Sequence, residues 1–379
     1  MLHNQEALNQ FLVENNLILS EGYVNSRNFM CKNESCSQRF KGFGKVKRKR
    51  NLSLSRMLTL TQEGQDIVEA LYFQCKNCNT YLSPRTSGFL TYTDRLGRSN
   101  CKLAPEKILQ IIFHWASRSS VVDCMELLDL TKPSIIDWFN FCRDVCTTSN
   151  IIAHTRKLGN GQARGTNGEL PDVVIQIDEC LLRGKRMYNR GRILTGDQNI
   201  LIEDIAEWMS MNENNENQMD PGRNYGRRIT GPWIFGMAEC IGSERDKYKT
   251  GEVRLFKVEK RDAATLIPLI VSNVEPGSMI WSDQWAAYNQ IQSLEAGLSH
   301  EKVNHSENFV SITGAYTQNI EREWSKLKLK LLKNMRGTSE DLLQSHLEEY
   351  MWRSRVEGGI WEVFMKIIKE ASEQYPITT

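Results

Sequence analysis

Four short runs of β-branched and aromatic residues place the strongest constraint on the fold. Each is typical of a β-strand, and they are VVIQIDE (173–179), WIFGMAEC (233–240), VRLFKVE (253–259) and SMIWSD (278–283). Between the third and the fourth lies AATLIPLIVSNV (263–274), which is typical of a helix that Pro268 starts or kinks. Strands followed by helices predict a mixed α/β domain over residues 172–338.

The first half of the chain shows helical and linker patterns instead of strand-like runs. Residues 155–171 are rich in glycine and polar residues and are predicted to form a linker. Residues 101–154 show helical periodicity in three pieces, with Pro105 and Pro133 suited to first helical positions and Ser119 or Ser120 to a cap. Three short helices with a tight turn between the last two fit a helix-turn-helix module that binds DNA. The alternative is a plain helical spacer.

Two further regions complete the predicted organisation. Between Arg192 and Arg223 there is no lysine or arginine, and acidic residues recur, so residues 195–222 are predicted to be an acidic surface insertion. Residues 339–379 are predicted to be a C-terminal helical region. The 379 residues suit two or three domains. No apolar run approaches the roughly 20 residues of a membrane helix, so we expect an intracellular protein with no membrane partner.

Four of the ten cysteines form two close pairs. Cys31 and Cys36 are five positions apart, and Cys75 and Cys78 are three positions apart. Two such pairs supply the soft ligands of a tetrahedral structural Zn²⁺, as in a zinc ribbon. Residues 1–100 are therefore predicted to be a zinc-knuckle and basic N-terminal region. The alternative is four free buried thiols, because cysteine also behaves as a small hydrophobic residue.

A basic run lies between the two cysteine pairs. In KGFGKVKRKR (41–50), six of ten residues are lysine or arginine, and the run ends with Lys47, Arg48, Lys49 and Arg50. We predict that these four contact DNA. Three roles stay open for the run: a solvated loop, a nuclear address, or an arm on the phosphates.

Two acidic residues lie at the ends of predicted strands, and a third lies in a later predicted helix. Asp178 closes VVIQID, Asp283 closes MIWSD, and Glu321 lies in the helical stretch YTQNIEREWSKLKLKLLKNM. Carboxylates at two strand ends can meet at one edge of a sheet, and a helix can lower a third over them. Three such groups can hold two divalent cations about 3.5–4 Å apart, the arrangement used for in-line displacement at phosphorus. Spacing alone is weak evidence, because a chain with 46 acidic residues offers many such triplets.

Six short sequence motifs, which follow one another in a fixed order along the chain, add to this evidence. They are IDE (177–179), KRMYNRGR (185–192), GPWIFGMAE (231–239), WSDQWAAY (281–288), VNHSENFV (303–310) and GAYTQNIEREWSKLK (314–328). Together they resemble the Merlin-type DDE transposases and their bacterial insertion-sequence relatives. The resemblance implies an α/β ribonuclease-H-like catalytic core, preceded by a zinc-ribbon-like and helical (helix-turn-helix) DNA-binding region. The acidic insertion separates the second motif from the third, which is a departure from the family pattern.

The same resemblance implies roles for particular residues. Asp178, Asp283 and Glu321 would be catalytic and would bind two Mg²⁺ or Mn²⁺ ions, while Glu179 and Glu323 would point elsewhere. His305 either approaches the scissile phosphate or hydrogen-bonds within its loop. Basic residues beside the site are predicted to contact DNA phosphates, with a solvated helix face as the alternative: Lys185, Arg186, Arg190, Arg192, Lys326, Lys330 and Lys333. Trp281, Trp285 and Tyr288 are expected to pack in the core rather than to stack on flipped bases.

The predicted activity is therefore DNA transposition. The resemblance implies binding of terminal inverted repeats, cleavage, and transfer of the strand to a target by two-metal-ion chemistry. Double-stranded DNA, as transposon ends and target, would be the partner of a homodimer or a larger synaptic assembly. The expected location is the nucleus in a eukaryote, and otherwise the cytoplasm or nucleoid. Two alternatives are a domesticated, non-catalytic DNA-binding protein and a nuclease that cuts without rejoining.

Overall fold

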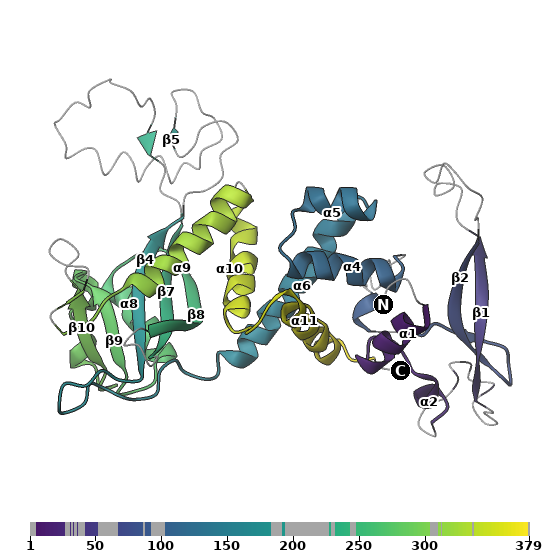
Figure 1. Ribbon diagram of the computed structural model, residues 1–379, viewed down its shortest axis with the longest axis horizontal. Coiled ribbons are helices and arrows are strands. Elements are labelled where there is room, and N and C mark those ends of the chain that lie inside the picture. Colours follow the sequence, from purple (N-terminus) through teal and green to yellow (C-terminus); the bar gives the residue numbers. More distant parts are fainter. Residues whose placement is uncertain are drawn as a thin grey trace. The chain divides into compact units, whose positions relative to one another are not determined.

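The computed structural model describes residues 5–26, 31, 33, 36, 42–51, 67–85, 88–91, 103–182, 192–193, 227–228, 232–242, 248–303, 310–311, 313–335 and 337–377. These form two compact units, each described separately below. The first comprises Met1–Val145 and Gly358–Thr379, and the second comprises Cys146–Glu357 (Figure 1). Among the described residues, no helix is both long and apolar enough to cross a membrane.

A three-stranded antiparallel sheet lies in the first unit. Its strands are β1 (Phe43–Asn51), β2 (Ile67–Cys75) and β3 (Tyr81–Leu82), in the order β1-β2-β3. The basic run 41–50 thus lies largely on β1, where Phe43 pairs with Cys75, rather than in a loop. Two helices, α1 (Gln5–Glu14) and α2 (Glu21–Val24), precede the sheet. Val24 of α2 is buried in one small core with Phe43, Phe73 and the cysteines.

Three helices follow in the first unit: α4 (Pro105–Ala116), α5 (Val121–Leu128) and α6 (Lys132–Ala153), the last of which runs on into the second. Pro105 takes the first turn of α4, as predicted. Ser120 caps α5, because its hydroxyl accepts from Asp123 N (3.1 Å) and its own N–H donates to the Asp123 carboxylate (3.2 Å). Asp129, with φ of 51°, opens the tight turn to α6. The C-terminal helix α11 (Ile360–Gln374) packs on α4.

The second unit is built on a five-stranded mixed sheet. Its strands are β4 (Val173–Leu181), β7 (Trp233–Gly242), β8 (Tyr248–Val258), β9 (Met279–Asp283) and β10 (Ser299–Val303). The order is β10-β9-β4-β7-β8, with β9 parallel to both β4 and β10 and with β7 antiparallel to β4 and β8. A meander joined to parallel strands by a crossover helix, α8 (Ala263–Asn273), is the topology of a ribonuclease-H-like core.

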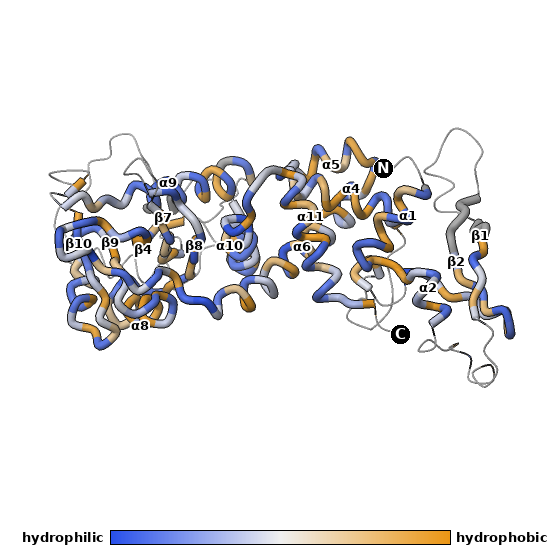
Figure 2. The backbone as a smooth tube through the Cα atoms, turned by 60° about the horizontal axis from the view of Figure 1, so that its bottom comes forward, coloured by the Kyte–Doolittle hydropathy of each residue, from blue (hydrophilic) through white to orange (hydrophobic). Residues whose placement is uncertain are grey.

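Helices cover both faces of this sheet. On one face, Val174 and Cys180 of β4 share a core with α9 (Gln318–Lys328) and α10 (Glu340–Ser354). On the other face, Ile175 and Ile177 pack against α8. Figure 2 shows α9 and α8 on opposite sides of the strands. The alternation of β4 side chains between these two cores fixes which face each acidic residue at its end must occupy.

The predicted linker 155–171 is tied to this sheet. Leu158 N donates to Asn273 O (2.7 Å). The Arg156 guanidinium donates to both oxygens of Glu239 (3.0 and 2.9 Å) and to Glu252 (2.8 Å). The unit that holds the sheet also extends past residue 338, to Glu357, and so includes α10. At the ends of the acidic insertion, the short strands β5 (Arg192–Ile193) and β6 (Arg227–Arg228) pair with each other.

Candidate active site

Two aspartates lie side by side at the ends of neighbouring parallel strands. In the β4–β9 ladder Gln176 is opposite Trp281. The ladder ends there, and continuing its register by two residues would set Asp178 opposite Asp283, in keeping with the effect of the Asp283 charge, which raises the pKa of Asp178. Strand alternation places both on the face covered by α9, because Cys180 of β4 and Trp281 of β9 belong to the core on that side. Adjacent strands are about 4.8 Å apart, so the two carboxylates are neighbours.

A third carboxylate comes from α9, in the position that the sequence predicts. Buried Gln176 anchors the helix, since its Oε1 accepts from Asn319 N (3.0 Å) and Ile320 N (3.1 Å) in the first turn of α9. The next residue is Glu321, whose Oε1 accepts a hydrogen bond from the Thr317 hydroxyl (2.8 Å). One side chain of β4, two residues before Asp178, thus sets the position of the helix that carries Glu321.

A cavity of about 650 Å³ lies between the end of β4 and α9. Asp178 and Glu321 both line it, with Trp324, Ser325 and Lys328. Asp283 stands beside Asp178 and is not in the lining. Its Oδ1 accepts from Trp285 N (3.2 Å).

Trp324 holds Asp178 in place. Its indole Nε1 donates to Asp178 Oδ2 at 2.9 Å. The ring lies over Gly236, the residue of β7 that pairs with Asp178. A Cβ at that position would be 2.4 Å from Trp324 Cη2, so only glycine lets the indole approach this closely.

The electrostatics of the cluster disfavour negative charge. Burial raises the pKa of Asp178 to about 7, against hydrogen bonds from Glu179 N–H and Trp324 that lower it, and the charges of Asp283 and Glu179 raise it further. Burial also raises the pKa of Glu179. Carboxylates whose mutual repulsion raises their pKa values are a common feature of catalytic sites, and a bound cation offsets that repulsion.

The two neighbouring glutamates point elsewhere. Glu179 accepts a hydrogen bond from the Tyr288 hydroxyl, and Tyr288 belongs to the core on the α8 face. Glu323 is buried against α10, where it accepts from the Tyr350 hydroxyl (2.7 Å) and from Lys326 Nζ (2.6 Å). Glu179 and Glu323 are thus both engaged by other side chains of the fold.

The donor set fits hard divalent cations, because carboxylate oxygens are the ligands that Mg²⁺ and Mn²⁺ prefer. The three carboxylates are not drawn into one tight cage. Across the described parts of the chain, only the cysteine quartet brings three or more ligand atoms all within 4.8 Å of one another. Asp178, Asp283 and Glu321 would supply oxygen ligands to such cations, which would provide the charge needed at a reacting phosphate.

The basic residues predicted to contact DNA have mixed surroundings. Lys326 pairs with Glu323, and Lys330 pairs with Glu349 of α10 (3.0 Å). Lys328, seven positions after Glu321 and therefore on its helix face, lines the cavity instead. Lys185, Arg186, Arg190 and His305 lie outside the described residues, as do the side chains of Arg192, Lys333, Lys47, Arg48, Lys49 and Arg50. Their DNA contacts stay predictions.

Sequence reasoning missed three residues of this site, Gln176, Gly236 and Trp324, and it counted Lys328 only among the lysines after Glu321 that could neutralise backbone phosphates. Trp324 and Lys328 follow Glu321 by three and seven positions, which is a helical-face signal that the sequence offered. Nothing local marks Gln176 or Gly236, since their roles arise from pairing with α9.

The four predicted zinc ligands come together in the first unit. Cys31 Sγ lies 3.5 Å from Cys78 Sγ, and Cys36 Sγ lies 3.6 Å from Cys75 Sγ. These separations exclude disulfides, whose bonds measure about 2.05 Å, and they match the roughly 3.8 Å expected between thiolates around one Zn²⁺. The hydrogen bond with the Thr80 hydroxyl lowers the pKa of Cys78 to about 6, while burial raises that of Cys31 to about 12. The cluster fits a structural Zn²⁺.

The sheet order and the acidic cavity define a ribonuclease-H-like core with a carboxylate site. A family model described as an ISXO2-like transposase domain matches residues 206–355, a range that contains Asp283 and Glu321. An uncharacterized transposase-like protein of Haemophilus influenzae is 31% identical over 91 residues, which is 24% of this chain and 71% of that protein. The chain belongs to the DDE transposases, and the resemblance found in the sequence is confirmed.

One solved structure also overlaps this chain. It is a pre-cleavage Mos1 transpososome, with 10% identity and a TM-score of 0.23, over 72% of this chain and 79% of that one.

Proposed function

We propose that this protein is an active DNA transposase that cleaves DNA at terminal inverted repeats and joins the freed strand to a target. One observation carries the proposal: Asp178 and Asp283 are aligned on neighbouring strands, and Glu321 is brought to the same face by α9. This arrangement supports phosphoryl transfer with two divalent cations.

Each side chain of the site has a role in this proposal. Asp178, Asp283 and Glu321 would hold two Mg²⁺ or Mn²⁺ ions, and these would supply activation of the attacking oxygen and stabilisation of the leaving one. Trp324 keeps one Asp178 oxygen directed by its 2.9 Å hydrogen bond. Lys328, in the cavity wall, is placed to neutralise a backbone phosphate.

The first unit would bind the transposon ends. The cysteine quartet would hold a structural Zn²⁺ beside the basic strand β1, and the α5–α6 pair would act as a helix-turn-helix module. Two ends must be held together, so we propose a homodimer or a larger synaptic assembly. In a eukaryotic host the protein would work in the nucleus, and otherwise in the cytoplasm or nucleoid.

Cleavage of DNA that carries the inverted repeats flanking the gene tests this proposal. We expect Mg²⁺-dependent nicking at the repeat tip, abolished by Asp283→Asn and by Glu321→Gln. Glu323→Gln, two residues away on the same helix but turned toward Tyr350, is the matched control and should keep activity once folding is verified. Tight binding of the ends without cleavage by the wild type would instead indicate a domesticated DNA-binding protein.

Pre-cleaved ends separate transposition from simple hydrolysis. A transposase joins them to a target plasmid in the presence of Mg²⁺. A nuclease that nicks the repeat tip but never joins pre-cleaved ends would contradict the strand-transfer part of the proposal.

A further inference from the structure

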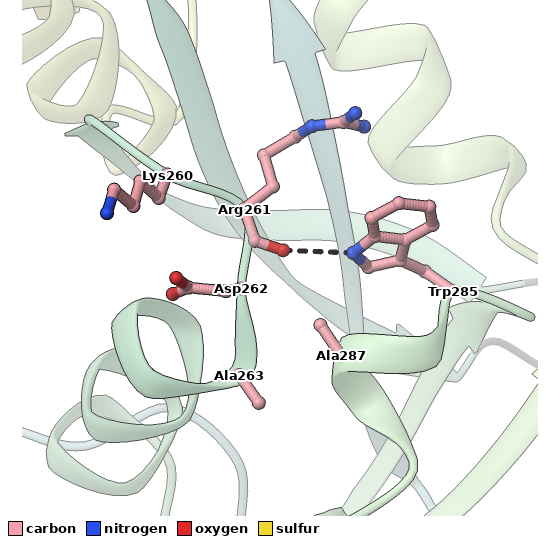
Figure 3. Close-up of a pocket in the computed structure, with 6 residues that line it drawn as sticks. All are labelled: Lys260, Arg261, Asp262, Ala263, Trp285 and Ala287. Carbon is pink, nitrogen blue, oxygen red and sulfur yellow. Dashed lines mark hydrogen bonds between the residues drawn. The ribbon is translucent and has the colours of Figure 1, made fainter. Parts of the chain in front are cut away.

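A second hollow, of about 470 Å³, opens beside the carboxylates and is not used by the chemistry above. Lys260, Arg261, Asp262, Ala263, Trp285 and Ala287 line it (Figure 3). It lies where the end of β8 enters α8 and where the chain leaves β9. It therefore combines two cationic side chains with one large aromatic ring.

Arg261 and Trp285 form a built platform in this hollow. The Arg261 guanidinium carbon lies 3.7 Å from the ring centre of Trp233 and 4.8 Å from that of Trp285. The Trp285 indole N–H donates to Arg261 O at 3.0 Å, the bond drawn in Figure 3. Trp285 stays 38% exposed, whereas Trp281 and Tyr288, the other aromatics of the same motif, are fully buried.

The platform contacts one of the three carboxylates and borders the cavity of the other two. Trp285 N donates to the Asp283 carboxylate, and Trp233 lines the larger cavity that holds Asp178 and Glu321. Asp262, the one acidic residue of the hollow, is occupied by capping α8, where it accepts from Thr265 N (2.9 Å) and the Thr265 hydroxyl (2.6 Å). The hydrogen bonds from Thr265 lower the pKa of Asp262 and keep it ionised, so Lys260 and Arg261 leave the lining of the hollow with a net positive charge.

We propose that this hollow binds one unpaired nucleotide next to the scissile phosphate, with its base stacked on Trp285 and its phosphate on Arg261. An aromatic plane accepts any base, a guanidinium accepts phosphate, and the volume suits a small ligand rather than a duplex. Enzymes that work on duplex ends can move a base out of the stack into such a pocket. This inference rests on the proposed function, because it names a subsite for the same DNA.

A double-mutant cycle tests the pairing of Trp285 with one base: the tryptophan and a DNA base are removed separately and then together. Binding is measured without added divalent metal, on synthetic duplexes of the inverted-repeat end with an abasic site at each position around the cleavage point. Trp285→Ala should weaken binding of the intact end roughly 5- to 150-fold. For the wild-type protein, an abasic site at one position should cause the same loss of affinity. For Trp285→Ala, that abasic site should cause no further loss. Independent effects at every position would overturn the inference.

Matched variants separate stacking from folding. Trp285→Phe keeps a flat ring and should restore most of the affinity, whereas Trp361→Ala, at a 49% exposed tryptophan of α11, should leave the abasic pattern unchanged. Arg261→Gln should lower the slope of log affinity against log salt by about 1, since one phosphate contact is lost. An unchanged slope would refute the role given to Arg261.

The outcome is distinguishable from failure of the proposed function. Wild-type cleavage of the same duplexes with Mg²⁺ is measured in parallel. Cleavage without any coupled position refutes the nucleotide subsite alone. A coupled position without cleavage supports the subsite and refutes the catalytic proposal.

Discussion

Replacing Gly236 with alanine should damage the active site without touching a carboxylate. The new Cβ would lie 2.4 Å from Trp324 Cη2 and 2.6 Å from Cζ2, where ordinary contacts begin at 3.4 Å. The indole must therefore move by about 1 Å. That shift breaks the 2.9 Å hydrogen bond from Trp324 to Asp178. Asp178 then loses the donor that orients it.

Two magnitudes follow from this displacement. Overpacking of a core costs about 1–3 kcal/mol, which for a unit of this size lowers Tm by roughly 2–12 °C. A misplacement of about 1 Å at a catalytic group costs on the order of 100-fold in rate. We expect Gly236→Ala to fold, to melt earlier, and to cleave the repeat end about 100-fold more slowly at saturating Mg²⁺.

Two companion variants make this prediction refutable. Gly251→Ala, in the neighbouring strand β8, meets atoms only at 3.4 Å and beyond, so its Tm and rate should stay close to wild type. Adding Trp324→Leu to Gly236→Ala should recover stability but not activity, because the indole donor is still absent. Wild-type activity in Gly236→Ala would refute the role that we give to the Trp324–Asp178 hydrogen bond.

Three further predictions concern other parts of the chain. Burial lowers the pKa of His154 to about 4, so the folded state binds fewer protons than the unfolded one between pH 6.5 and pH 4. The free energy of unfolding should therefore fall by roughly 2–3 kcal/mol as the pH falls through that window. A His154→Gln variant whose free energy of unfolding changes with pH as the wild type's does would contradict this. Arg254→Leu should cost about 1–3 kcal/mol in chemical denaturation, because Asn273 loses its donor (2.8 Å) and Glu252 loses one partner (2.9 Å) but keeps Arg156 (2.8 Å); a loss below about 0.5 kcal/mol would show that the ion pair is dispensable. Purified protein should contain one equivalent of Zn²⁺ by metal analysis, and Cys75→Ser should lower this content and the thermal stability of the first unit; full-length protein free of zinc yet equally stable would favour four plain thiols.

The strands and the three candidate carboxylates could be predicted from the sequence because local patterns mark them. The runs that end at Asp178 and Asp283 are apolar enough to indicate buried strands, and their polar last residues stand out. Strand β10 was not predicted, since SHEKV has too few β-branched residues, and its pairing with β9 supplies what its composition lacks. The basic run also gave no strand signal, although β1 pairs with β2 over its whole length. Tertiary pairing overrides local propensity in both cases.

The surroundings of the carboxylates were harder to predict. Lys330 was predicted to lie on a basic helix face, yet it stands in the π-helical turn Leu329–Asn334 after α9 and pairs with Glu349 of α10, which no local spacing could indicate. Gln176 looks like any polar residue within a strand until the first turn of α9 is seen to donate two backbone N–H groups to its amide oxygen. Such roles depend on contacts between different segments, 19 positions apart for Lys330 and Glu349 and 143 positions apart for Gln176 and Asn319.

Metal specificity at Asp283 tests the central claim most directly. In Asp283→Cys, a thiolate replaces a hard oxygen ligand, which Mg²⁺ rejects and the softer Mn²⁺ tolerates. If Asp283 binds a catalytic cation, this variant should fail to cleave the repeat end in Mg²⁺ and should recover measurable cleavage in Mn²⁺. Equal cleavage in the two metals, at the wild-type rate, would show that Asp283 is not a metal ligand.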